Sequence, residues 1–431
     1  MIDTNSQNIE KFILSALEES LKTPNLEDSS ELISIKSVGI IGAGTMGGGI
    51  AMNFANVGLS VKIIETDDAK LKSGLERVRE NYQRSADKGR FPQQQVADRM
   101  NLICGSLSLN DLSNCDLIIE AAFEEITIKK QLFSQLEEIA KPGSILATNT
   151  SGLDINEIAS MTNRAGDVIG LHFFSPANVM KLLEIVQGKD TKAKVIKSCI
   201  DIAQKINKVP ILVGVCDGFV GNRILWARQR QAMRLVGEGV MPWDIDKALN
   251  DFGFKMGPFQ MSDLAGLDLG WSKGVNTINP IKDALCEAGR RGQKTGKGYY
   301  DYDKNRNPSP SLETEKIIKK ITSAEKITLP KERIVESLIY PMINEGLKIL
   351  DENKAQRASD IDIVWLYGYG WPRSTGGLMY YGDQIGAQRI LEIMKTLSME
   401  DETIKISRLL IECSQNNTKF LDIVTDGLIT T

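Results

Sequence analysis

Short apolar runs alternate with helix-like stretches over the first half of the chain. The apolar runs have the length of buried β-strands and lie at residues 38–41, 61–65, 116–120, 144–147 and 168–171. Between them, small residues at 48–57 and a long charged stretch at 67–100 predict helices. Strands that alternate with helices are typical of parallel βαβ units with right-handed crossovers. We therefore expect a parallel sheet covered by helices.

The second half of the chain has a helical pattern with an internal similarity. Helices are expected over 224–240 and 244–252, and the polar, proline-containing stretch 305–311 has the composition of a linker. Two glycine-rich segments that lead into an aspartate each follow an Asp-Ile-Asp triplet. These segments are 256–266 and 376–386, and the triplets are 244–246 and 360–362. We interpret the similarity as a tandem duplication of one helical unit.

The composition describes a globular chain of more than one domain. At 431 residues, it is longer than one hydrophobic core usually supports. A net charge of −4 and an isoelectric point near 5.5 provide no basic field, so we expect neither nucleic acid nor a membrane as a partner. No apolar run reaches the ~18–20 residues of a membrane span. The acidic first 35 residues predict an amphipathic helix and a linker instead of a secretion signal, and hence a cytoplasmic protein.

The cysteines and the single histidine limit metal chemistry. The six cysteines lie at positions 104, 115, 199, 216, 286 and 413, without a CxxC pair. One histidine cannot complete the usual Cys/His zinc sites. We therefore expect reduced thiols and no bound metal.

A glycine motif follows the first apolar run. Gly42, Gly44 and Gly47 form a GxGxxG pattern between the expected strand and helix, where each glycine has a function. The first allows a tight turn, the second lets the backbone approach a pyrophosphate, and the third lets the helix pack closely on the strand. Glu65, at the end of the second run, would accept hydrogen bonds from ribose hydroxyls and repel a 2′-phosphate. This indicates NAD instead of NADP, although a glycine turn in another α/β fold is the alternative.

These patterns predict an α/β fold with a Rossmann-type dinucleotide-binding domain, followed by two tandem all-α helical domains. The expected boundaries are 1–35 for an N-terminal helix and linker, 36–213 for the NAD-binding domain, 214–311 for the first helical domain and 312–431 for a second, degenerate helical repeat.

His172 is the only histidine, and it directly follows the apolar run at 168–171. Histidine is the usual general acid or base near neutral pH. Asn149 and Ser151 follow the preceding run in the same way, and ligands of parallel sheets lie beyond the carboxyl ends of strands. We therefore expect these three side chains to converge. Each residue alone also has an ordinary interpretation, as a packed histidine beside two phenylalanines or as a turn or cap residue.

Several motifs together resemble those of the 3-hydroxyacyl-CoA dehydrogenases. The motifs are residues 39–47, Asn-Thr-Ser at 149–151, Gly-Leu-His-Phe-Phe-Ser-Pro at 170–176, 180–186, Asp-Gly-Phe-Val-Gly-Asn-Arg at 217–223 and Met-Gly-Pro-Phe at 256–259. The resemblance extends from residue 36 to the C-terminus. Its two helical repeats resemble the dehydrogenase portion of the multifunctional β-oxidation enzymes. Ser175 stands where the family often has asparagine.

The resemblance implies a role for each matching residue. His172 would be the catalytic base and Glu184 its partner, while Ser151 and Asn222 would bind the substrate near its reacting oxygen. Lys88 would lie near the coenzyme A moiety. The residues implied at the NAD cofactor are Gly42, Gly44, Thr45, Met46, Gly47, Glu65, Ala121, Glu124, Lys129, Asn149 and Ser151.

The resemblance also implies a substrate and an assembly. The substrate would be an acyl-CoA thioester, with 3-hydroxybutyryl-CoA and acetoacetyl-CoA as short-chain examples. The second repeat has 334–337 where the first has 219–222, so it lacks the asparagine and should be non-catalytic. It would pack on the first repeat as a dimer partner does in short relatives, which allows a monomer and leaves a homodimer open. Only about thirty-five residues precede the first strand, so we expect no enoyl-CoA hydratase activity.

Two other functions are open at this point. One is a dehydrogenase of free β-hydroxy acids, which would not need the long helical stretch at 67–100. The other is a non-catalytic NAD-binding assembly protein, which would not need the combination of His172, Glu184, Ser151 and Asn222.

Overall fold

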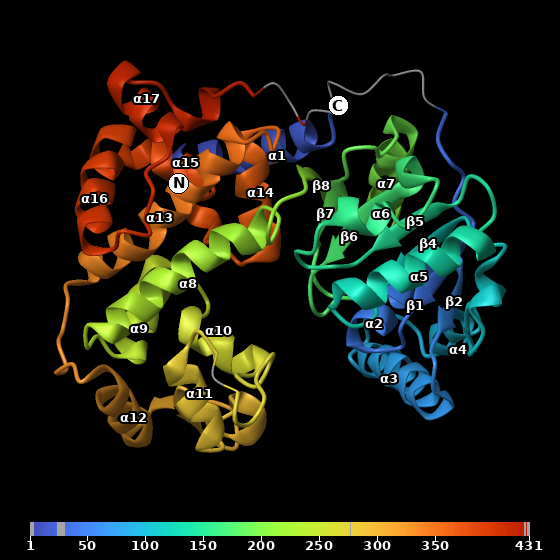
Figure 1. Ribbon diagram of the computed structural model, residues 1–431, viewed down its shortest axis with the longest axis horizontal. Helices are drawn as coiled ribbons and strands as arrows, with labels where there is room; N and C mark the ends of the chain where they lie inside the picture. The colour runs from blue at the N-terminus through green and yellow to red at the C-terminus, as the bar shows by residue number, and fades with distance from the viewer. Residues whose placement is uncertain (1–3, 24–30, 276, 426–427, 429–431) are drawn as a thin grey trace. The chain divides into compact units, whose positions relative to one another are not determined.

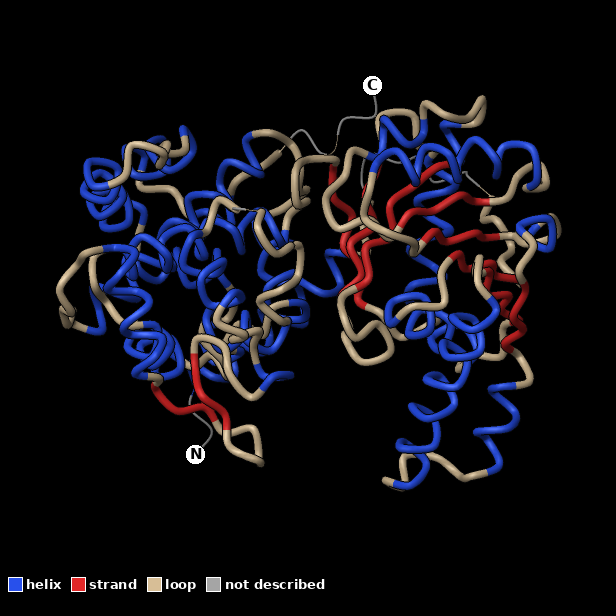
Figure 2. Tube along the Cα trace, turned by 60° about the horizontal axis from the view of Figure 1, so that its bottom comes forward, coloured by secondary structure: helices blue, strands red, loops and turns tan. Residues whose placement is uncertain are grey.

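The computed structural model describes residues 4–23, 31–275, 277–425 and 428. Contacts divide the chain into two compact units. The first contains Met1–Arg223, Ile349–Tyr369 and Leu421–Thr431, and the second contains Ile224–Lys348 and Gly370–Phe420. The large sheet belongs to the first unit, whereas the second is helical except for a small hairpin (Figure 2). Residues 349–369, from the second helical repeat, thus pack with the sheet.

The first unit contains an eight-stranded sheet (Figure 1). In spatial order its strands are β3 (Ile103–Ser106), β2 (Ser60–Ile64), β1 (Ser37–Ile41), β4 (Leu117–Glu120), β5 (Ile145–Thr148), β6 (Val168–Phe173), β7 (Leu182–Gln187) and β8 (Val209–Gly214). The strands from β1 to β6 are parallel, which confirms the predicted Rossmann-type fold. β7 runs antiparallel to β6, and β8 runs parallel to β7.

Helices cover both faces of this sheet. On one face, the apolar side chains of α2 (Thr45–Ala55), α3 (Asp68–Asp87), α4 (Gln94–Met100) and α7 (Ala193–Lys205) join those of the strands in one core. On the other face, α5 (Ile126–Ile139) and α6 (Ile155–Ala159) pack together and α6 contacts β6. Near β7 and β8, α14 (Ala358–Gly368) packs on the strands and α1 (Thr4–Ser20) packs on α14. The short 3-10 helices η1 (Leu109–Leu112) and η2 (Ala165–Asp167) lie in the connections.

The charged stretch at 67–100 is not one helix. It divides into α3 and α4, which are separated by residues 88–93. Gly89 has a positive φ of 70°, and Pro92 cannot continue a helix that comes from the preceding turn. The predicted helical stretch is therefore present, but it is interrupted at residues 88–93.

The helical part begins with α8, whose first turn belongs to the first unit. Its elements are α8 (Gly221–Gly237), α9 (Pro242–Phe252), α10 (Pro258–Ala265), α11 (Pro280–Glu287), η3 (Gln293–Thr295), β9 (Tyr300–Tyr302), β10 (Pro308–Pro310), α12 (Leu312–Thr322), α13 (Lys331–Asp351), η4 (Arg373–Thr375), α15 (Leu378–Ile385), α16 (Ala387–Glu400), α17 (Arg408–Asn416) and η5 (Phe420–Asp422). No helix in the described ranges is both long and apolar enough to cross a membrane.

A shared contact supports the duplication. Asp263 in α10 accepts hydrogen bonds from the backbone N–H groups of Tyr299 and Tyr300. Asp383 in α15, the residue aligned with Asp263, accepts one from the N–H of Phe420. In both repeats an aspartate thus anchors backbone about 37 residues further along the chain. The series α8–α9–α10 and α13–α14–α15 therefore correspond.

The two repeats meet through aromatic side chains within the second unit. Phe252 and Phe254 of the first repeat pack edge-on against Trp371 of the second, with ring centroids 5.7 and 5.4 Å apart. Gln231 also donates a hydrogen bond to Asp401 at 2.8 Å. The predicted packing of the second repeat on the first is thus present.

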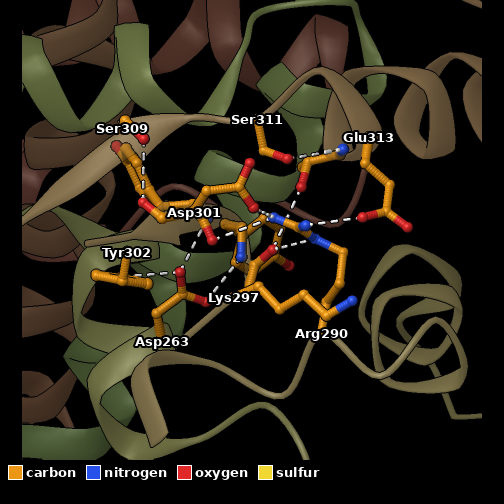
Figure 3. A network of polar contacts seen from close by, with 12 residues as sticks. Asp263, Arg290, Lys297, Asp301, Tyr302, Ser309, Ser311 and Glu313 are labelled. Carbon is orange, nitrogen blue, oxygen red and sulfur yellow. Dashed lines mark hydrogen bonds and ion pairs between the residues drawn. The ribbon is translucent and has the colours of Figure 1, made fainter. Parts of the chain in front are cut away.

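The segment 305–311 is not a simple linker (Figure 3). Its residues 308–310 form β10, which pairs antiparallel with β9. Arg290, whose side chain is buried, makes ion pairs with Asp301 in β9 and with Glu313 at the start of α12 (2.7 and 3.0 Å). The linker prediction is wrong because the amino-acid composition of 305–311 does not predict strand pairing or tertiary contacts.

Candidate active site

The loop after β1 has the shape expected of a dinucleotide-binding turn. Gly42 has a positive φ of 107°, a conformation that favours glycine, and its N–H donates to the carbonyl of Ile64. A Cβ atom on Gly47 would lie 1.9 Å from the carbonyl oxygen of Gly42. At Gly44, in contrast, a Cβ atom would meet nothing within 4 Å. The loop is therefore closed on its inner side and open where a pyrophosphate would approach the N-terminus of α2.

A cleft of about 1100 Å³ extends from this loop. Of the residues predicted at the cofactor, Gly42, Gly44, Glu65 and Ala121 line it. Glu65 accepts hydrogen bonds from the N–H groups of Ala43 (3.1 Å) and Thr66 (2.9 Å), which hold its carboxylate at the end of β2. The glycine loop, the cleft and this carboxylate fit the phosphates and ribose of NAD. Thr45, Met46 and Gly47 form the adjacent first turn of α2.

A buried ion pair lies at the ends of β4 and β5. The Lys129 ammonium is 2.8 and 2.9 Å from the two carboxylate oxygens of Glu120, and both side chains are inaccessible to solvent. The hydroxyl of Thr148 donates to the same carboxylate at 2.7 Å. Burial of a charged pair is favourable only when its remaining hydrogen-bonding groups are satisfied, as they are here. Lys129 also lies 3.3 Å from Glu124, which connects this pair to the next cluster.

Glu124 holds the turn that carries Ser151. Its Oε1 atom accepts hydrogen bonds from the Thr150 hydroxyl and from the N–H and hydroxyl of Ser151, at 2.6–2.9 Å. Burial opposes the charged form of Glu124, but these hydrogen bonds and Lys129 outweigh it and lower the pKa of this carboxyl. Contacts of Glu124, Lys129 and Asn149 with a cofactor stay a prediction.

His172 and Glu184 face each other across β6 and β7. The antiparallel register pairs them directly, and Nδ1 of His172 lies 2.7 Å from Oε2 of Glu184. The other carboxylate oxygen, Oε1, accepts a hydrogen bond from the N–H of Gly221 at 2.9 Å, in the first turn of α8. Glu184 is completely buried, and the partial positive charge of the helix N-terminus stabilises its negative charge. We assign the imidazole proton to Nδ1, because the carboxylate accepts it, which leaves a lone pair on Nε2.

The other predicted side chains gather around this pair. Asn149 accepts a hydrogen bond from the N–H of Phe173 at 2.9 Å, so the ends of β5 and β6 are joined beside His172. Asn222 donates from Nδ2 to the carbonyl of Ser151 at 3.2 Å. The sequence therefore predicted correctly that His172, Asn149 and Ser151 lie near one another. Lys88 lies elsewhere, exposed at the C-terminal end of α3.

Aromatic rings and a lysine hold the loop that follows His172. The rings of Phe174 and Phe219 lie 4.4 and 5.8 Å from the imidazole, measured between centroids. The Lys208 ammonium donates to the carbonyls of Ala177 and Met180 between β6 and β7. Burial, followed by repulsion from a neighbouring lysine, lowers the pKa of Lys208 to about 8.

Sequence reasoning missed three contributors to this site. Glu120 could have been recognised from the sequence, because it ends an apolar run and Lys129 follows nine residues later. Gly221 acts through its backbone N–H, which the side-chain pattern does not reveal. Tyr369 donates its hydroxyl hydrogen to Asn222, from 147 residues further along the chain, and no local pattern predicts such a contact.

The fold and the site define a dinucleotide-binding protein of the Rossmann class, with a carboxylate-backed histidine at the sheet edge. Residues 37–216 match the NAD-binding domain of 3-hydroxyacyl-CoA dehydrogenase. Residues 218–302 match the C-terminal domain of the same family. The chain belongs to the 3-hydroxyacyl-CoA dehydrogenase family.

Relatives with similar sequences are larger proteins. The chain is 40% identical over 397 residues to the peroxisomal bifunctional enzyme of Cavia porcellus, covering 86% of this chain and 54% of that protein. It is also 40% identical to the human peroxisomal bifunctional enzyme, covering 83% and 53%, respectively. The chain therefore spans about half the length of the curated relatives it matches.

Two solved structures show how much of the fold is shared. The dehydrogenase part of multifunctional enzyme 1 from C. elegans matches with a TM-score of 0.67 and 32% identity, over 94% of this chain and 96% of that chain. The (S)-3-hydroxybutyryl-CoA dehydrogenase of Ralstonia eutropha matches with a TM-score of 0.56 and 33% identity. It covers 63% of this chain and 100% of its own.

Proposed function

We propose that the chain is an NAD-dependent (S)-3-hydroxyacyl-CoA dehydrogenase, which interconverts 3-hydroxyacyl-CoA and 3-ketoacyl-CoA. The observation that carries this proposal is the buried pair of His172 and Glu184 beside the carboxyl end of β5. Oxidation of a secondary alcohol requires a base for the hydroxyl proton and an acceptor for the hydride. The family membership supports the thioester substrate.

His172 supplies the base. With its Nδ1 proton directed to Glu184, the Nε2 lone pair can accept the proton of the substrate hydroxyl. The carbinol carbon loses its hydride, the C–O bond becomes a carbonyl, and the imidazole becomes an imidazolium. Bound NAD would supply the hydride acceptor. Glu184 stabilises the imidazolium, and the Gly221 N–H keeps one carboxylate oxygen from rotating away.

Asn222 and Ser151 orient the reacting oxygen. The two residues come from different elements, joined by the hydrogen bond from Asn222 Nδ2 to the Ser151 carbonyl. The second Nδ2 hydrogen is a donor for the reacting oxygen, and the Ser151 hydroxyl becomes one when its hydrogen rotates away from Glu124. Donors aimed at the oxygen stabilise negative charge that develops on the alkoxide or enolate. In the reverse direction, the imidazolium returns the proton and the 3-keto group is reduced.

The finer assignments also belong to this proposal. The similarity to a 3-hydroxybutyryl-CoA dehydrogenase supports a short-chain thioester as the first substrate to test. Lys88, at the end of α3, is a cation for the coenzyme A phosphates. The cytoplasmic location, the monomeric state and the lack of hydratase activity stay predictions. Localisation imaging, sedimentation at micromolar concentration and a crotonyl-CoA hydration assay test them in turn.

One experiment tests the reaction, the cofactor and the substrate class together. NADH oxidation is measured with acetoacetyl-CoA, a longer 3-ketoacyl-CoA and free acetoacetate, and each is repeated with NADPH. We expect turnover of the thioesters with NADH and much weaker turnover with NADPH, because Glu65 would repel the 2′-phosphate. Turnover of free acetoacetate alone would instead support a dehydrogenase of free β-hydroxy acids. NADH binding without any turnover would support an assembly protein.

A further inference from the structure

The Asn222 amide is held at both of its polar atoms. The Tyr369 hydroxyl donates a hydrogen bond to Oδ1 at 2.8 Å, and Nδ2 donates to the carbonyl of Ser151 at 3.2 Å. A primary amide nitrogen carries two hydrogens, so Nδ2 keeps one for a further acceptor. These two contacts define which end of the amide is the donor.

The ring of Tyr369 is itself held in place on several sides. It stacks on Trp365, which is completely buried, with centroids 4.6 Å apart and planes inclined by 25°. It also makes an edge-on contact with Phe174, at 5.4 Å, and Phe174 lies 4.4 Å from the His172 ring. A Cβ atom on Gly221 would lie 2.4 Å from the Tyr369 ring. The phenol therefore lies directly over the first turn of α8.

Contacts other than those of the phenol hold the segment that carries Tyr369 against α8 and the sheet. The Glu352 carboxylate accepts from both terminal nitrogens of Arg223, at 2.5 and 2.8 Å. The carbonyl of Lys354 accepts a hydrogen bond from the N–H of Gly214 at the end of β8. Gly368 lies against Leu182 of β7, where a Cβ atom would come within 2.4 Å of the leucine. A rigid element thus delivers the hydroxyl, as a positioning group requires.

From these contacts we infer that Tyr369 is a positioning residue for the reaction. The Ser151 carbonyl, which can only accept, selects the orientation of the Asn222 amide. The Tyr369 hydroxyl fixes the amide at Oδ1 and thereby directs the second Nδ2 hydrogen at the substrate's reacting oxygen. In the opposite orientation, the amide oxygen would face that oxygen and repel its lone pairs. The degenerate repeat thus completes the site through residues 349–369, although it has no asparagine at the position aligned with Asn222. This inference rests on the proposed function.

The test is a double-mutant cycle between Tyr369→Phe and Asn222→Ala. The phenylalanine keeps the contacts with Trp365, Phe174 and Gly221 and removes only the hydroxyl. We expect Tyr369→Phe to lower kcat/KM for acetoacetyl-CoA roughly 3- to 10-fold, the effect of one neutral hydrogen bond, with unchanged NADH affinity and melting temperature. In the Asn222→Ala background, the same substitution should change kcat/KM by less than about 1.5-fold, because its target is gone. Tyr367→Phe, two residues earlier in the last turn of α14, is the matched control and should leave kcat/KM unchanged in both backgrounds.

Two results would overturn the inference. One is wild-type kcat/KM in the Tyr369→Phe variant. The other is an equal loss in both backgrounds, which would mean that the hydroxyl acts on something other than Asn222. Failure of the proposed function gives a different result, because the wild-type protein would then lack thioester turnover or His172→Gln would retain it. Absence of turnover in the wild type would remove the inference as well.

Discussion

The Nδ1 atom of His172 lies 2.7 Å from Oε2 of Glu184, at the place where the sheet changes direction. β6 is parallel to β5, whereas β7 is antiparallel to β6, so the register places the two residues directly opposite each other. The hydrogen-bonded pairing of β6 with β7 therefore fixes the positions of His172 and Glu184 relative to each other. The twelve-residue spacing in the sequence covers the end of β6, the connecting loop and the start of β7.

The first prediction concerns Glu184→Gln. The glutamine can still accept from Gly221, but its amide can donate to Nδ1 and thus favour the tautomer with a proton on Nε2, which cannot act as a base. We expect kcat for oxidation of 3-hydroxybutyryl-CoA to fall roughly 10²- to 10⁴-fold. The pH–rate profile should also change, because the carboxylate that accepts from the imidazole is gone. A profile measured from pH 5 to 9 checks this, and an unchanged profile would mean that Glu184 only packs.

The second prediction separates two glycines of the loop. In Gly47→Ala, an ideally placed Cβ atom would lie only 1.9 Å from the carbonyl oxygen of Gly42, which is a steric clash. We expect this substitution to lower the free energy of unfolding by roughly 1–3 kcal/mol. Gly44→Ala meets no protein atom within 4 Å and should melt like the wild type. It should nevertheless weaken NADH binding, because the methyl group occupies the space in front of the N-terminus of α2. Thermal melting and NADH titration distinguish the two effects, and normal NADH affinity in Gly44→Ala would refute the proposed position of the pyrophosphate.

The third prediction concerns acid stability. Asp116 accepts hydrogen bonds from the N–H groups of Lys36 and Ser37 and from the Lys141 ammonium, at 2.6–2.9 Å. Although burial opposes the charge, these donors lower the pKa of Asp116 to about 2. A depressed pKa in the folded state stabilises the protein above the unfolded-state value of about 4, and this stabilisation is lost as the pH falls toward 2.

Asp116→Asn should therefore be less stable than the wild type at neutral pH, by roughly 1 kcal/mol after allowance for solvent screening. The difference in the free energy of unfolding should shrink between pH 4 and pH 2. Urea unfolding at several pH values measures it. Asp98→Asn, on the exposed side of α4, is the control and should show no such trend. A difference for Asp116→Asn that stays constant with pH would contradict this account of the carboxylate.

Local patterns predicted much of the first unit. The apolar runs before the glycine loop and before Glu65 are strands because both of their faces are buried, and this leaves continuous hydrophobic segments in the sequence. The three strands β3, β7 and β8 were not predicted. β3 is an edge strand with one buried residue, β7 contains the buried Glu184, and β8 contains Pro210. Polar or proline residues thus interrupt the signal where the edge of a sheet or a functional site allows them.

From the sequence, only the site residues at the carboxyl ends of predicted strands could be placed. Asn149 follows β5 and His172 lies near the carboxyl end of β6, so their convergence follows from parallel topology. The contact between His172 and Glu184 requires β7 to run antiparallel to β6, and no residue pattern predicted this change of direction. Tyr369 depends on a helix that crosses from the second repeat to the sheet, so only tertiary structure reveals it.

The measurement that tests the central claim most directly is turnover of acetoacetyl-CoA by His172→Gln, with the NADH dissociation constant measured in parallel. Glutamine keeps a polar side chain near Glu184 but has no group that exchanges a proton near neutral pH. The account predicts that turnover falls roughly 10²- to 10⁴-fold while NADH affinity stays near that of the wild type. His172 is the only histidine of the chain, so no other imidazole can replace it. Near-normal turnover in this variant would contradict the account.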